Sequence, residues 1–215
     1  MRVISFVTQK GGSGKSTTAA SVAVAAFQAG RKVFLLEMDK QGTLSDWREN
    51  RQSDEGPDFE RVATKDLDKA LAALRAAQYD LVVIDTPGVD SPDNNAIMRA
   101  SDLCLIPARP TAADLRGCTP TAEALIRLRK PFSFVLTQCP PRSPRVEEAR
   151  AGLRALGLVA EPPIVSRADH QDALAAGQGV GEFNPDGAAA QEIRQLFAWI
   201  EAKLNPKAKS HVKVA

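Results

Sequence analysis

The sequence has little that would suit a membrane span, a disulfide framework or a cysteine-bound metal. No apolar run approaches the roughly 20 residues that a membrane-spanning helix needs. The three cysteines, Cys104, Cys118 and Cys139, are odd in number and lack the spacing of metal ligands, which suits a reducing cytosol. Because the chain opens with an apolar run, we expect no signal peptide. These absences predict a cytoplasmic protein without a membrane partner.

Aromatic residues, histidines and net charge are also scarce. Aromatics make up 5% of the 215 residues, so alanine, valine and leucine must fill the core, as in a sheet packed closely between helices. The formal net charge is +2, so any nucleic-acid binding must come from a local patch rather than from bulk charge. The two histidines, His170 and His211, are expected at the surface and receive no role.

Short apolar runs alternate with helical patterns along the chain. This alternation predicts an α/β fold with a doubly wound, mostly parallel sheet and helices on both faces. We expect one domain over residues 1–204 and a flexible basic tail at 205–215. Strands are predicted at Arg2–Thr8, Lys32–Met38, Phe59–Ala63, Leu81–Asp85, Leu103–Ala108, Phe132–Thr137 and Pro163–Ser166. Helices are predicted at Lys15–Ala29, Thr43–Asn50, Lys65–Ala77, Asn94–Arg99, Thr111–Leu128, Pro144–Leu156, Ala168–Ala176 and Gly187–Leu204.

The most informative segment is the glycine-rich string Q-K-G-G-S-G-K-S-T at 9–17, between a predicted strand and a predicted helix. That context is the one that a phosphate-binding P-loop requires, and a simple glycine-rich turn would leave its two lysines unexplained. Lys15 is expected to reach the β- and γ-phosphates of ATP, and the Ser16 hydroxyl to hold Mg²⁺. The predicted nucleotide contacts of this loop are Lys10, Gly11, Gly12, Ser13, Gly14, Lys15, Ser16 and Thr17.

A second feature is Asp85, which follows four apolar residues in the pattern called Walker B. The end of such a strand lies near the metal side of a P-loop, so Asp85 is predicted to bind Mg²⁺ through water. The alternative is an aspartate that only caps a turn. Phosphoryl transfer relies on positioning and charge neutralisation, so no serine or histidine triad is needed.

The string K-G-G-S-G-K-S-T resembles the deviant Walker A motif of the ParA/MinD family of ATPases, in which the extra lysine, here Lys10, reaches the nucleotide of a dimer partner. E-M-D-K-Q-G at 37–42 is similar to the family's D-x-D-P-Q-G, with Glu37 and Lys40 as departures. The resemblance implies that Asp39 orients the attacking water and joins the metal shell; capping of the next helix is the alternative. It therefore predicts Lys10, Lys15 and Asp39 as catalytic residues, and Ser16, Asp85 and Asp39 as metal residues.

Weaker similarities continue along the chain. Leu105–Thr111 with Asp114 resembles a family loop near the dimer interface. Gln138 ends the strand that holds adenine in relatives, and Gly177–Pro185 resembles the loop that closes over the base, so Gln138 and Pro185 are predicted base contacts. Short strings at 47–50 and 93–95 are similar to the VirC-type ParA relatives of DNA transfer.

Several branches of this family fit poorly. The segment 205–215 offers no apolar face for a MinD-type membrane helix. Tyr79 is the single tyrosine, which excludes a tyrosine-kinase tail, and Cys104 and Cys118 do not suit an iron–sulfur cluster. The length leaves no room for the glutaminase domain of amidating synthetases.

What remains is a short ParA-like ATPase. The resemblance implies an ATP-dependent sandwich homodimer, nonspecific DNA binding, nucleoid association, and slow hydrolysis stimulated by a ParB-like partner that carries a cargo. A P-loop ligase or kinase is one alternative, and a nucleotide-regulated adaptor with little hydrolysis is another, given Glu37 and Lys40. Candidate DNA contacts, which an ordinary solvated surface would also explain, are Arg142, Arg145, Arg150, Arg154, Arg167, Arg194, Lys203 and Lys207.

Overall fold

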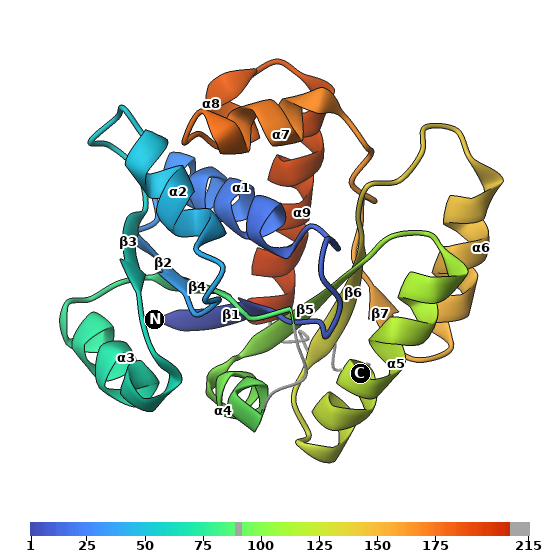
Figure 1. Cartoon of the computed structure of the whole chain (residues 1–215), viewed down its shortest axis with the longest axis horizontal. Coiled ribbons are helices and arrows are strands. Elements are labelled where there is room, and N and C mark those ends of the chain that lie inside the picture. The colour runs from blue at the N-terminus through green and yellow to red at the C-terminus, as the bar shows by residue number, and fades with distance from the viewer. Residues whose placement is uncertain (89–91, 207–215) are drawn as a thin grey trace, which may run out of the picture.

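The computed structural model describes residues 1–88 and 92–206. At its centre is a seven-stranded sheet in the order β3-β2-β4-β1-β5-β6-β7, with parallel pairing between each pair of neighbours (Figure 1). The doubly wound parallel fold predicted from the sequence is thus confirmed. The strands are β1 (Arg2–Phe6), β2 (Val33–Glu37), β3 (Asp58–Arg61), β4 (Leu81–Asp85), β5 (Leu103–Ala108), β6 (Phe132–Leu136) and β7 (Leu158–Val159).

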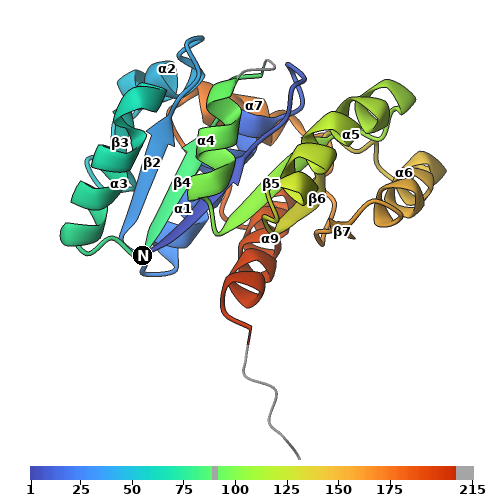
Figure 2. The same cartoon turned by 90° about the horizontal axis from the view of Figure 1, so that it is seen from below.

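Helices cover both faces of this sheet (Figure 2). Leu35 and Val83 pack on one face with α1, α2, α7, α8 and α9. Their chain neighbours Leu36 and Val82 pack on the other face with α3 and α4, because successive side chains of a strand point to opposite sides. The helices are α1 (Lys15–Gln28), α2 (Thr43–Asn50), α3 (Leu67–Ala76), α4 (Pro92–Ala100), α5 (Ala112–Arg127), α6 (Pro144–Arg154), α7 (Ala168–Ala175), α8 (Val180–Phe183) and α9 (Ala188–Leu204).

The order in which successive strands are added to the sheet reverses at β1, which lies between β4 and β5. In a doubly wound sheet, ligands bind beyond the carboxyl ends of the strands at such a switch point. The P-loop follows β1 directly, so the topology places it there. The hydrophobic core beneath it includes Ile4 and Phe6, both fully buried.

The last predicted strand, Pro163–Ser166, is wrong. The seventh strand is β7, which pairs with β6, while Val165 forms an isolated bridge with Cys139 in place of a ladder. Ile164 and Ser166 still donate to the carbonyls of Leu136 and Cys139, so this segment runs beside the end of β6 with a single bridge and not as a regular strand.

Other parts of the chain were also predicted differently. The short helix α8 lies in a stretch that was predicted as a loop. Of the predicted tail at 205–215, residues 207–215 lie outside the described part. No helix in the described part of the chain has the length and apolar character of a membrane span.

Candidate functional site

The loop between β1 and α1 has the geometry of an anion-binding loop. Gly12 and Gly14 have φ values of 72° and 88°, a left-handed conformation that glycine adopts without strain. Gly14 is the N-cap of α1, whose first turn contains no acidic side chain. The free N–H groups and the positive dipole end of α1 are therefore open to an anion.

Two side chains from the end of β6 hold this loop in place. The Thr137 hydroxyl donates to the Ser13 carbonyl at 2.7 Å, and the Gln138 side-chain amide donates to the Gly12 carbonyl at 2.9 Å. These bonds join segments more than 120 positions apart, so the tertiary fold pre-forms the loop.

Lys15 lies at the bottom of the loop and is 7% exposed. Its ammonium donates to the Lys10 carbonyl at 3.2 Å. Burial lowers the pKa of Lys15, while Asp85 and Asp39 oppose that shift. A first side-chain carbon at Gly88 would lie 3.0 Å from Lys15 Nζ, so a glycine lets the chain after β4 pass close to this lysine. The arrangement presents a buried positive charge to the phosphate side of the loop.

Asp85 ends β4 and is fully buried. Its Oδ2 accepts a hydrogen bond from the Ser16 hydroxyl at 2.6 Å, and its Oδ1 has no partner among the described residues. Burial raises the pKa of Asp85 to about 7, although Ser16 and Lys15 act in the opposite direction; Glu37 and Asp39 add to the rise. A further cation would stabilise the ionised carboxylate.

The Asp85–Ser16 pair fits Mg²⁺. This ion prefers oxygen ligands and usually keeps waters and substrate phosphates in its shell, so it needs only one or two protein groups. No cluster of three or more His, Cys, Asp or Glu side chains that could hold a metal is found within residues 1–88 and 92–206.

Glu37 and Asp39 lie at the end of β2 and have different roles. Glu37 is fully buried and accepts the Leu44 N–H at 2.8 Å, the Ser45 N–H at 3.1 Å and the Ser45 hydroxyl at 2.5 Å. Asp39 is half-buried and accepts the N–H of Gln41 at 3.0 Å, within its own loop. The alternative that Asp39 caps the next helix is therefore wrong, because the first turn of α2 donates to Glu37 and Asp39 bonds only within its own loop.

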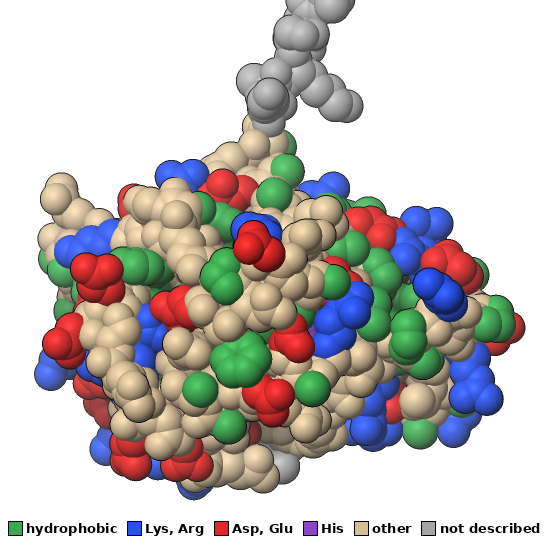
Figure 3. Space-filling view, turned by 90° about the horizontal axis from the view of Figure 1, so that it is seen from above, with side chains coloured by type: hydrophobic (Ala, Val, Ile, Leu, Met, Phe, Trp, Pro, Cys, Tyr) green, Lys and Arg blue, Asp and Glu red, His purple; other side chains and the backbone are tan. Residues whose placement is uncertain are grey.

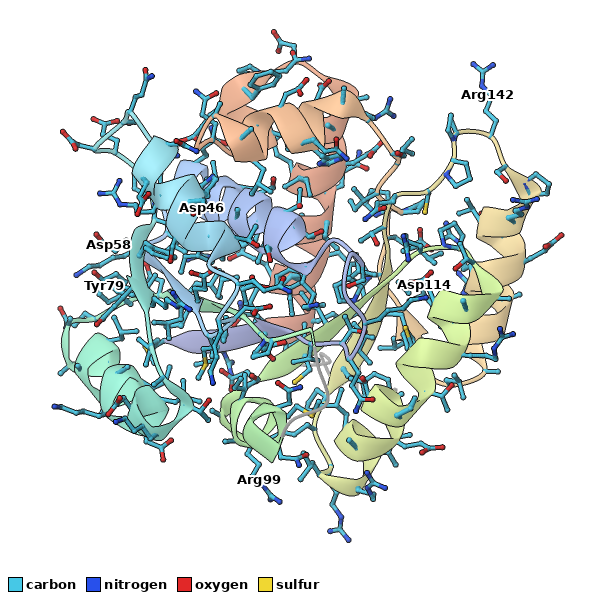
Figure 4. The ribbon with its side chains drawn as sticks, in the orientation of Figure 1. Asp46, Asp58, Tyr79, Arg99, Asp114 and Arg142 are labelled. Carbon is cyan, nitrogen blue, oxygen red and sulfur yellow. The ribbon has the colours of Figure 1, made fainter. Side chains whose placement is uncertain are left out.

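The Lys10 side chain reaches a carboxylate of α5. Its ammonium lies 3.3 Å from Asp114 Oδ1, near the start of that helix (Figure 4). Burial alone would raise the pKa of Asp114, but hydrogen bonds from Thr111, Arg109 and Lys10 outweigh it and hold the pKa below its usual value. The two P-loop lysines thus have different surroundings, since Lys10 pairs with Asp114 while Lys15 donates to the Lys10 carbonyl and lies near the charges of Asp85 and Asp39.

A cavity of about 90 Å³ adjoins the P-loop on the side of β6. Gln138, which was predicted to contact the base, lines it together with residues of the segment 164–171. Pro185 is exposed in the loop after α8 and is not among the lining residues. The expectation that His170 is a surface residue is wrong, because it is half-buried in this lining, where burial lowers its pKa.

The segment 164–171 is the part of the site that the sequence analysis missed. The available signal was that this segment, predicted in part as the strand Pro163–Ser166, approaches the edge of the sheet where the P-loop lies, since ligands bind at that edge. Arg167 in this segment is held by Glu192 at 2.7 Å.

The predicted base-covering loop packs elsewhere. Gly177–Pro185 lies against α2, where Arg51 donates to both carboxylate oxygens of Glu182, at 2.6 and 2.9 Å, and to the Gly177 carbonyl at 2.9 Å. The Trp47 indole donates to the Gln178 carbonyl at 3.1 Å. A larger cavity of about 620 Å³ opens here. The Arg51–Glu182 ion pair in its lining carries no net charge, and the P-loop does not line it.

Several of the candidate DNA contacts are engaged in ion pairs. Arg150 pairs with Glu147 and Glu161, and Arg167 with Glu192. Arg142, which points outward in Figure 4, and Arg145 are both exposed, and neither makes an ion pair among the described residues. Figure 3 shows acidic and basic side chains interspersed over the face that carries α7 and α8. The remaining candidates are Arg154, 3.6 Å from Glu161, Arg194, which donates to the Pro185 carbonyl, Lys203, which lies over the Trp199 ring, and Lys207, outside the described residues.

Known proteins resemble this chain in sequence and in fold. The family model described as VirC1 protein matches residues 1–131. The chain is 33% identical over 208 residues to maintenance of carboxysome distribution protein A of Gloeobacter kilaueensis, covering 95% of this chain and 94% of that protein. It is 31% identical over 185 residues to protein virC1 of Rhizobium rhizogenes, covering 82% and 80%. The septum site-determining protein MinD of Pyrococcus horikoshii, complexed with Mg-ADP, has the same fold, with a TM-score of 0.75, 19% identity and coverage of 97% and 99%.

Proposed function

Because the chain belongs to the VirC1 protein family, whose relatives are ParA/MinD-type P-loop ATPases, we propose that it is an ATP-driven positioning protein. ATP joins two copies into a sandwich dimer, the dimer binds DNA without sequence preference, and a ParB-like partner stimulates slow hydrolysis and release of a cargo. The observation that carries this proposal is the pair of lysines in one loop, each with its own surroundings. The protein acts in the cytoplasm, on the nucleoid when ATP is bound.

The residues around the P-loop divide the chemistry between them. The N–H groups of Gly12 to Thr17 and the Lys15 ammonium bind and neutralise the β- and γ-phosphates. Ser16 and Asp85 would hold Mg²⁺, which neutralises further phosphate charge when bound. Asp39, at the mouth of the site, orients the attacking water. Gln138 and the segment 164–171 receive the base.

The surroundings of Lys10 support a role between two subunits. Its side chain is 33% exposed and is paired with Asp114 rather than with the phosphate side of its own loop. A partner's phosphates carry more negative charge than one carboxylate, so binding across the interface can compete for this lysine. Dimer formation then requires ATP, because ADP lacks the γ-phosphate that closes the interface.

The proposal is tested by light scattering and ATP turnover with wild-type protein, Lys10→Ala and Lys15→Ala. We expect the wild type to be monomeric with ADP and dimeric with ATP. Lys15→Ala should lose nucleotide binding, whereas Lys10→Ala should keep some binding and lose dimer-coupled hydrolysis. Equal dimer content of the wild type with and without ATP would contradict the proposal. A dimer that forms but never hydrolyses ATP would favour the nucleotide-regulated adaptor.

A further inference from the structure

The geometry points to Glu37 as a positioning residue for ATP hydrolysis. Its carboxylate ties the start of α2 to the end of β2 and thereby fixes the loop 38–42, which carries Asp39. The catalytic half of this inference rests on the proposed ATPase activity, while the structural half does not.

The start of α2 has no side-chain cap of its own. Its N-cap is Gly42, in a left-handed conformation with φ 77°, which has no side chain to accept from the first turn. The first N–H groups of any helix need an outside acceptor, and Glu37 supplies one for Leu44 and Ser45. The Ser45 hydroxyl is a third donor to the same carboxylate. Since Glu37 is fully buried, water does not reach it to replace these contacts.

Glu37 also lies next to the reaction site. It pairs in register with Asp85 on the neighbouring strand, so both side chains project from the same face of the sheet. There Asp85 accepts from Ser16 on α1, while Glu37 accepts from Ser45 on α2. The two buried carboxylates therefore set the starts of the two helices that border the phosphate side of the site.

The remaining contacts of α2 explain why the loop depends on Glu37. The far end of the helix is fixed by Arg51, which bonds to Glu182, and by Trp47, which bonds to the Gln178 carbonyl. Loss of the Glu37 contacts would therefore free the N-terminal turn and the loop before it, rather than the whole helix. Within that loop Lys40 is exposed, and Asp39 has only a local bond to Gln41 to orient it.

The length of the side chain matters as well as its charge. An aspartate at position 37 would be one methylene shorter, which withdraws the carboxylate by roughly 1.5 Å. It could keep its bonds to α2 only if the first turn moved toward β2 and took the loop with it. Displacements of about 1 Å can cost up to about a hundredfold in rate, so Asp39 would be misplaced.

The test compares Glu37→Gln, Glu37→Asp and Ser45→Ala with the matched control Glu60→Gln, which removes an exposed carboxylate from the adjacent strand β3. We expect Glu37→Gln to lower kcat about tenfold with KM for ATP within about twofold, because the P-loop contacts are untouched. Ser45→Ala removes one donor and should act in the same direction with a smaller loss. The control should leave kcat unchanged.

Two further measurements separate positioning from a loss of stability. Amide hydrogen exchange should accelerate in peptides covering 38–50 and stay unchanged in α9 (Ala188–Leu204), at a temperature where each variant is folded. In an Asp39→Ala background, Glu37→Gln should lower kcat no further, because Glu37 acts through Asp39.

An additive loss of kcat in that background, or unchanged exchange over 38–50, would overturn the inference. A wild type without turnover whose Glu37→Gln variant still exchanges faster at 38–50 would defeat the ATPase proposal and support the structural half of this one.

Discussion

The two lysines of the P-loop show how surroundings assign different tasks to one residue type. Lys15 is buried, with Asp85 and Asp39 favouring its charge, so it can meet phosphate without rearrangement. Lys10 is partly exposed and held by Asp114 on α5, which leaves it outside the phosphate side of its own loop. The surroundings of Lys15 suit nucleotide binding within one chain. Those of Lys10 suit a contact that forms only when a second chain binds.

At the same scale, Asp39→Ala should trap the ATP-bound state. In the proposed mechanism the P-loop and the Asp85–Ser16 pair would hold the nucleotide independently of Asp39, so binding should survive while the attacking water loses its acceptor. We expect turnover to fall about a hundredfold with ATP affinity nearly unchanged, measured by phosphate release and by binding of a fluorescent ATP analogue. Asp54→Ala, which removes an exposed carboxylate from the loop after α2, is the control. Normal turnover in Asp39→Ala would exclude Asp39 from catalysis.

Among the elements, α2 is bonded at both of its ends to residues that lie outside the helix. Glu37 holds its start, and Arg51 joins its end to Glu182, 131 positions away. The Trp47 ring also lies under the Arg51 guanidinium, 5.2 Å from its centre. This helix links the loop of Asp39 to the segment between α7 and α8.

Arg51→Ala should therefore be strongly destabilising. Its side chain is 2% exposed, and its removal leaves the Glu182 carboxylate without its bidentate partner and two carbonyls without a donor. We expect a loss of about 3 kcal/mol in the free energy of unfolding, measured by urea denaturation. Arg48→Ala, at an exposed position of the same helix, should change it by less than about 0.5 kcal/mol. Equal effects of the two substitutions would show that the buried pair contributes little.

For the whole molecule, the unequal distribution of charge matters more than its net value of +2. The half that carries α5 and α6 has more basic than acidic residues, whereas the half before β5 has more acidic ones. Within the basic half, Arg142 and Arg145 are exposed near the start of α6. A dimer would bring two such sparse groups of cations to one DNA duplex.

We accordingly expect the ATP-bound protein to bind unrelated duplexes equally and the ADP-bound protein to bind them much more weakly. Each phosphate contacted adds about 0.9 to the slope of log affinity against log salt, so the dimer should show the steeper slope in gel shifts. Arg142→Glu with Arg145→Glu should weaken binding by at least about tenfold. Lys65→Glu with Lys69→Glu, at exposed positions near the other edge of the sheet, is the control with the same change of charge. No binding even at low salt would contradict the DNA proposal.

The sequence by itself determined the strands β1 to β6, their parallel topology and the place of the P-loop. These features follow from local signals, namely short apolar runs, glycines before the start of a helix and acidic residues at strand ends. Such signals suffice because hydrophobic periodicity and the conformational preference of the backbone depend on residues that are neighbours in the sequence. The run after the prolines at 162 and 163 shows the limit of such signals, since it was predicted as a strand although it forms only an isolated bridge with Cys139.

Only the tertiary structure decided which polar atoms meet. The bond of Thr137 to Ser13, the bonds of Arg51 to Glu182 and the cap of α2 by Glu37 connect residues that no local period relates. Each depends on how the helices pack on the sheet, and each satisfies a buried group that would otherwise be costly to desolvate. The same packing placed segment 164–171, and not Pro185, beside the P-loop, because the chain from 177 onward is held against α2.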